Sequence, residues 1–227
     1  MTQNQIKEIM DMLNTLQENL LSLPDDMLLN IDPRDNESVE NGMQFIISFN
    51  ESLDQFIDST SKIENQIKRH FEMNPEEDDI EKETVNRLKR ERIIQELDTT
   101  TPHSLDEDFT YKRPYGFVLE EAAYKGIKTW KNLYLNVLQV LNGKDFGRFS
   151  LLPDNDSFIS IRGNRLFSRN EELLRVPVKL EAGFYAEINL SANHIRNNIK
   201  LLLEYFKIDY RNMRIYLRED RDAIHSK

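Results

Sequence analysis

The residues best suited to chemistry are four polar side chains in the stretch ANHIRNNIKLLLEYF, residues 192–206. They are Asn193, Arg196, Asn197 and Lys200, and their spacing places them on about one face of a helix. Arg and Asn can each form two hydrogen bonds with a base edge, and Lys suits phosphate groups. The sequence therefore predicts an exposed contact face for a nucleic acid or a partner protein. A merely solvated face is the alternative, because every amphipathic helix turns polar side chains outward.

Arginines that precede this helix in the sequence would enlarge the contact face if the fold brings them close to it. Two aromatic residues among them, Phe167 and Tyr185, would then offer surfaces on which bases could stack. The arginines concerned are Arg162, Arg165, Arg169 and Arg175.

The motifs of the common catalytic classes do not occur in the sequence. It has no Gly-rich phosphate loop, no GxSxG and no HExxH, and its four His residues lack the spacing of a metal site. Arg218 and His225, with six residues between them, match the loose Arg-x4–6-His pattern of a family of helical ribonucleases. A solvated, charged tail explains the same residues. We therefore expect a non-enzymatic protein that uses no cofactor and no metal.

Composition restricts the compartment and the kinds of site. The chain has no Cys, which excludes disulfides and thiolate metal sites. No apolar run approaches the roughly 18 residues that a membrane span requires. The start, MTQNQIKEIM, lacks the basic and apolar regions of a signal peptide. We expect a cytoplasmic protein of a bacterium or a phage that does not contact a membrane.

Charge is distributed unevenly along the chain, whose net charge is -10. Residues 1–110 contain 10 Lys+Arg and 26 Asp+Glu, whereas residues 111–227 contain 20 and 14. Every Tyr and the single Trp lie in the second part. This change predicts an acidic segment over residues 1–98, a linker over 99–110 and a basic module over 111–227. Proteases should cut the linker between Thr99 and Asp108.

Apolar residues three and four positions apart predict helices in the acidic segment. One seam runs over Ile6–Leu23 and should end at Pro24; a second runs over Ile46–Phe71, and a charged third helix is expected over residues 76–97. Seams of this length favour self-association as a coiled coil, and the alternative is a hairpin packed within one chain or against the second segment. We expect a homo-oligomer whose acidic half contacts protein, because its charge repels DNA.

The basic module predicts an α+β fold with a small, largely antiparallel sheet and two helices, because strands and helices mix without βαβ alternation. Thr129 and Ser191 are expected to cap the two helices, and Gly143 to follow the end of the first. Alternation and turn residues predict strands at 115–119 and 122–124, and within 157–168, 183–190 and 212–220.

Three stretches of the module support a resemblance: YKRPYGFVLEEAAYKGIKTWKNLYLNVLQVL, RLFSRNEELLRVPVKL and FYAEINLSANHIRNNIKLLLEYF. They resemble a C-terminal module of bacterial proteins from restriction, phage-defence and mobile-element neighbourhoods. The resemblance covers about half of the chain and implies an accessory role without catalytic residues. The expected function is an accessory protein that assembles through its helices and contacts nucleic acid or a defence-system protein with its module. A pure protein-interaction adaptor or inhibitor is the alternative, and a small ribonuclease is a third hypothesis.

Overall fold

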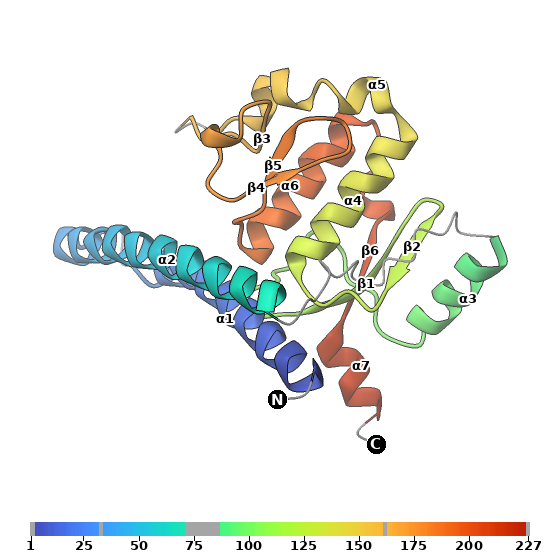
Figure 1. Cartoon of the computed structure of the whole chain (residues 1–227), viewed down its shortest axis with the longest axis horizontal. Coiled ribbons are helices and arrows are strands. Elements are labelled where there is room, and N and C mark those ends of the chain that lie inside the picture. Colours follow the sequence, from blue (N-terminus) through green and yellow to red (C-terminus); the bar gives the residue numbers. More distant parts are fainter. Residues whose placement is uncertain (1–2, 32–33, 71–86, 161–162, 226–227) are drawn as a thin grey trace. The chain divides into compact units, whose positions relative to one another are not determined.

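The computed structural model describes residues 3–31, 34–70, 87–160 and 163–225, and it divides the chain into two compact units (Figure 1). Unit 1 is Met1–Arg87 and unit 2 is Leu88–Lys227. Unit 1 is helical and unit 2 combines helices with two small antiparallel sheets, which confirms the α+β fold class. The boundary differs from the predicted one, because residues 88–110 belong to unit 2.

Unit 1 is a helical hairpin of two long helices, α1 (Gln3–Asn30) and α2 (Asn36–His70), that lie side by side (Figure 1). The buried stripe of α2 is formed by Ile46, Leu53, Ile57 and Thr60. The prediction that Pro24 ends the first helix is wrong, since α1 continues to Asn30. Proline removes one donor but its φ is compatible with a helix, so a long helix can pass through it.

The first sheet of unit 2 has the strand order β2-β1-β6 and joins residues far apart in the sequence. Strand β1 (Pro114–Leu119) forms a hairpin with β2 (Ala122–Lys125), as predicted, and its other edge pairs with β6 (Arg214–Leu217). Helix α3 (Arg87–Leu97) packs on this sheet through Leu97, which is buried with Val118, Ala123 and Tyr216. The part of the predicted third helix before Arg87 lies outside the described residues.

The second sheet is short and has the strand order β3-β5-β4. Its strands are β3 (Phe167–Ser168), β4 (Pro177–Lys179) and β5 (Tyr185–Glu187). Single 3-10 turns at Leu152–Asp154, Asp156–Phe158, Glu171–Leu173 and Tyr210–Asn212 complete the connections. The strand predicted at the start of 157–168 is reduced to one bridge between Ile159 and Arg165.

The core of unit 2 lies around two helices, α4 (Trp130–Lys144) and α6 (Ala192–Tyr205), which pack side by side (Figure 1). The predicted caps are confirmed: the side chain of Thr129 accepts from Asn132 N–H, and that of Ser191 accepts from His194 N–H. Helix α4 extends past Gly143 to a C-cap at Asp145, which also begins the short helix α5 (Phe146–Phe149). Trp130, the only Trp, is buried in this core and its indole N–H donates to Lys112 O at 2.7 Å.

Residues 99–110, predicted to be an exposed linker, are instead part of the fold of unit 2. Leu105 and Phe109 are fully buried in the core. His103 forms an antiparallel bridge with Ile215, in which His103 N–H donates to Ile215 O at 2.7 Å and Ile215 N–H donates to His103 O at 2.9 Å. The polar composition of this stretch concealed two core side chains and one bridge to β6.

Candidate functional site

The polar face of α6 contacts a loop of its own chain, residues 103–110, which we call the acidic loop because it contains Asp106, Glu107 and Asp108. The side-chain oxygen of Asn193 accepts from the backbone N–H of Phe109 at 3.0 Å. Its amide nitrogen donates to Asp108 Oδ1 at 2.7 Å and to Thr110 Oγ1 at 2.9 Å. One asparagine thus fixes both the backbone and the side chains at the end of the loop.

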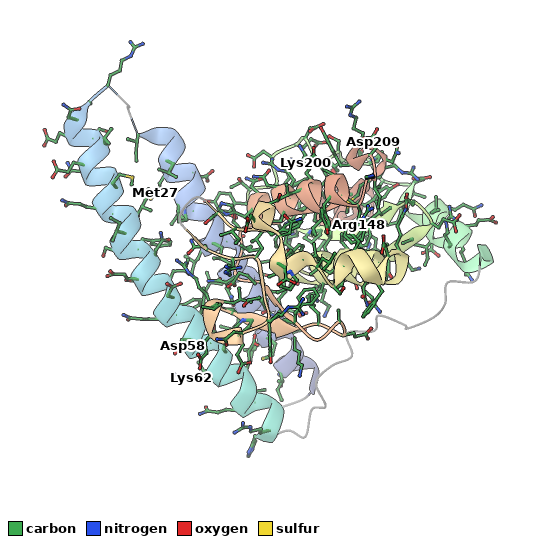
Figure 2. All side chains as sticks on the ribbon, turned by 90° about the horizontal axis from the view of Figure 1, so that it is seen from above. Met27, Asp58, Lys62, Arg148, Lys200 and Asp209 are labelled. Atoms are coloured by element: carbon green, nitrogen blue, oxygen red, sulfur yellow. The ribbon has the colours of Figure 1, made fainter. Side chains whose placement is uncertain are left out.

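The two basic residues of this face bind the same loop. Arg196 Nη1 donates to the backbone oxygen of Glu107 at 2.6 Å, and its other nitrogens donate to Asn197 Oδ1. Lys200 Nζ lies 2.5 Å from Asp106 Oδ1 and 4.9 Å from the ring centroid of Tyr210 (Figure 2 labels Lys200). The face predicted to be exposed is therefore half-buried, except at Asn197.

The carboxylates of the acidic loop are held in the ionised form. Hydrogen bonds from the backbone and hydroxyl of Thr110 and from Asn193 lower the pKa of Asp108 to about 2. The hydrogen bond from Lys200 lowers the pKa of Asp106. The negative charges of the loop and the positive charges of α6 therefore compensate each other within unit 2, which reduces the field that a phosphate backbone would meet.

A histidine at the other end of the acidic loop lies between two carboxylates. His103 Nδ1 is 2.6 Å from Glu107 Oε2, and its Nε2 is 2.7 Å from Asp220 Oδ2. Both ring nitrogens must donate, so this arrangement favours the imidazolium form. Desolvation by burial lowers the pKa of His103, but the hydrogen bonds to Glu107 and Asp220 outweigh it, and the net pKa is raised above 6.5.

Asp220 lies on α7 (Arg218–His225), a helix that is connected to β1 by further polar contacts. The carboxylate of Glu219 accepts from both the backbone N–H and the Nε of Arg113, the latter at 2.9 Å. The Arg221 guanidinium lies 4.6 Å from the ring centroid of Tyr115. His103 thus joins the acidic loop to α7, and Arg113 and Tyr115 join α7 to the chain around the start of β1.

The arginines predicted to enlarge the α6 face have other partners. Arg169 pairs with Asp154 at 2.7 Å, and Arg165 Nη1 donates to Pro153 O at 3.5 Å, so both lie at the turn Leu152–Asp154. Arg175 is exposed, and Arg162 lies outside the described residues. Phe167 is buried in the core and has no free ring face for a base, which corrects its predicted stacking role.

A buried carboxylate in unit 2 has a structural explanation. Glu187 accepts from the backbone N–H groups of Arg175, Val176 and Asn189, at 2.6, 3.2 and 2.7 Å. These bonds tie the start of β4 to the end of β5, and they occupy both carboxylate oxygens. Among the residues that the structure describes, no group of three or more His, Cys, Asp or Glu is placed to hold a metal ion.

No family model, curated protein or solved structure matches the chain. Within the described ranges, none of the helices is long and apolar enough to span a membrane.

His225, named in the ribonuclease hypothesis, belongs to α7, but its side chain lies outside the described set. The His103 cluster was not predicted from the sequence. Its only local signal is the four-residue spacing of His103 and Glu107, and Asp220 follows more than a hundred residues later.

Proposed function

We propose that the protein is a non-enzymatic binding protein whose helical hairpin contacts other protein molecules. We retain a partner protein as the ligand and set a nucleic acid aside. Asn193, Arg196 and Lys200 are engaged by the acidic loop, so a nucleic acid would have to displace contacts within the chain. Replacing internal charge pairs by contacts with phosphates gains little, because one set of pairs is exchanged for another.

One observation carries the proposal: exposed large apolar side chains are concentrated in unit 1. Of the eleven such side chains among the described residues, seven lie on α1 and α2. Met12 and Leu16 lie one turn apart on α1, as do Met43 and Ile47 on α2, and neighbouring exposed apolar side chains are typical of a protein-contact site. The seven are Met12, Leu16, Leu28, Met43, Phe45, Ile47 and Ile63.

The charge of unit 1 supports protein rather than nucleic acid as the partner. Residues 1–87 contain 7 Lys+Arg against 20 Asp+Glu. A surface with this excess of negative charge repels a phosphate backbone. We place this activity in a bacterial defence or mobile-element setting through the resemblance of residues 111–206, and that setting is part of the proposal.

A nucleic-acid shift assay at low and high salt tests the choice of partner, with Arg196→Ala/Lys200→Ala as the matched variant. We expect no salt-dependent complex of the wild-type chain with DNA or RNA. A complex that weakens with salt and is lost in the double variant would overturn the proposal.

A capture experiment tests the positive half of the proposal. Immobilised full chain should retain a protein from a cell extract after nuclease treatment, and a chain carrying Phe45→Ser and Ile63→Gln should lose it. Equal retention by both chains would remove the side of α2 that carries Phe45 and Ile63 as the contact surface.

A further inference from the structure

Helix α2 carries a heptad repeat of which only half is buried within the hairpin. Ile46, Leu53 and Thr60 are spaced by seven and are buried. A second set with the same spacing, Phe49, Phe56 and Ile63, is only partly buried or exposed. A two-stranded seam normally buries both sets between facing helices. The structure therefore leaves one half of the α2 seam incompletely covered.

The incompletely covered residues form an apolar stripe along one side of the helix. At about 100° per residue, Phe45, Phe49, Phe56, Ile63 and Ile67 lie within about 40° of each other. Phe45 and Phe49 stack with ring centroids 5.8 Å apart. From Phe45 to Ile67 the stripe spans about 33 Å at 1.5 Å per residue, which is about three heptads.

The border of this stripe that faces away from the buried set carries no charge. Its residues are Ser48, Ser52, Gln55, Ser59 and Gln66. Together with the stripe they define a sector about 120° wide, without Lys, Arg, Asp or Glu between Phe45 and Ile67. We call it the neutral sector. The charged residues between Phe45 and Ile67 project elsewhere, as in the Asp58–Lys62 pair at 3.0 Å (Figure 2).

We propose that the neutral sector of α2 binds the neutral sector of a second copy of this chain. The inference deepens the proposed function and rests on it. A chain with so strongly acidic a unit 1 can associate with itself only where its own charges are absent, and the neutral sector meets this condition. The neutral sector has no charged side chain that could form an ion pair with a charged partner protein. A two-fold contact pairs the stripe with itself, and the Ser and Gln border then lies at the rim.

The heptad spacing favours the binding of another helix with the same repeat. Helix α2 of a second copy is such a helix, because it has the same repeat and the same incompletely covered half of the seam. The resulting assembly is a four-helix bundle made of two hairpins, in which Phe49, Phe56 and Ile63 lie at the junction of the two copies.

Sedimentation equilibrium at micromolar concentration tests the inference, with a matched pair of α2 variants. Phe45→Ser/Ile63→Gln alters the neutral sector at side chains that are 45% and 44% exposed. Met43→Ser/Ile47→Gln alters side chains that are 39% and 57% exposed but lie outside the sector. The wild type and the second variant should have the mass of a dimer, and the first variant that of a monomer of 26.9 kDa.

A third variant guards against loss of folding in the first. Ser52→Lys/Ser59→Lys replaces exposed residues whose hydroxyls bond only to the backbone one turn earlier, so the hairpin should keep its helical circular dichroism. It places four ammonium groups in the contact between two copies and should abolish the dimer. A wild-type monomer, or a dimer that survives the Lys substitutions, overturns the inference. If the wild type is a monomer that still captures another protein through α2, the proposed function stands and self-association falls.

Discussion

Replacing His103 by Gln should change how the stability of unit 2 depends on pH. The variant keeps an N–H donor and the two backbone bonds to Ile215, but it removes the imidazolium that lies between Glu107 and Asp220. A hydrogen bond to a charged group contributes about 1.5–3 kcal/mol net, and the partial exposure of both carboxylates favours the low end of that range. With the His103 side chain only 15% exposed, the two bonds together contribute about 3 kcal/mol.

The sign of the pH effect follows from the direction of each shift. The pKa of His103 is raised in the folded chain, so its contribution is complete below about pH 6.5 and is lost as pH rises through the raised value. Burial raises the pKa of Glu107, but hydrogen bonds from His103 and Ser104 N–H outweigh this effect and lower it. The contribution of Glu107 is therefore complete above about pH 4.5 and is lost as pH falls through the lowered value.

Urea unfolding followed by the fluorescence of the single Trp130 measures this prediction, because Trp130 is buried in unit 2 beside Phe109. The free energy of unfolding of the wild type should fall by about 1–3 kcal/mol between pH 6 and pH 9, and His103→Gln should flatten this fall. His194→Gln is the control, since His194 is exposed and bonds to Ser191. Parallel curves for wild type and His103→Gln would refute the reasoning.

Three further substitutions test other contacts of unit 2 with the same assay. Asn193→Ala should cost about 1–3 kcal/mol, because the N–H of buried Phe109 loses its acceptor; Asn197→Ala, at an exposed position, should cost far less. Lys207→Gly should raise the free energy of unfolding of unit 2 by about 1 kcal/mol, because Lys207 follows the end of α6 with a φ of 60°. An unchanged urea midpoint would contradict this. Gly116→Ala should cost about 2 kcal/mol or more, since a Cβ there lies 2.5 Å from a β2 carbonyl oxygen; wild-type stability would show that the strands can separate locally.

The parts of the fold that sequence reasoning predicted depend on local signals. Thr129 and Ser191 were recognisable as caps because capping involves residues two or three positions apart. The β1–β2 hairpin was predictable for the same reason. The helix end predicted at Pro24 was wrong, because the tolerance of a long helix for one missing donor depends on its packing rather than on neighbouring residues.

The candidate site was only half predictable. The α6 face was identified from the spacing of Asn193, Arg196 and Lys200, but its partner was not. The acidic loop lies more than 80 residues earlier, and its Asp and Glu residues looked like part of a solvated linker. A sequence does not show which oppositely charged residues of two distant segments will form a pair. The same holds for His103 and Asp220, which lie together because His103 bridges to Ile215 of β6 and α7 follows β6 directly.

The pairing of β1 with β6 has a consequence for the order in which the two units acquire structure. Phe117 is paired with Ile215, about 100 residues further along the chain, so the first sheet of unit 2 needs a long loop closure before it gains stability. The hairpin of unit 1 contains only neighbouring segments and can form early. On a growing chain, α2 is therefore complete while β1 still lacks its partner. Two nascent chains on one messenger could join through their neutral sectors before either has closed its sheet.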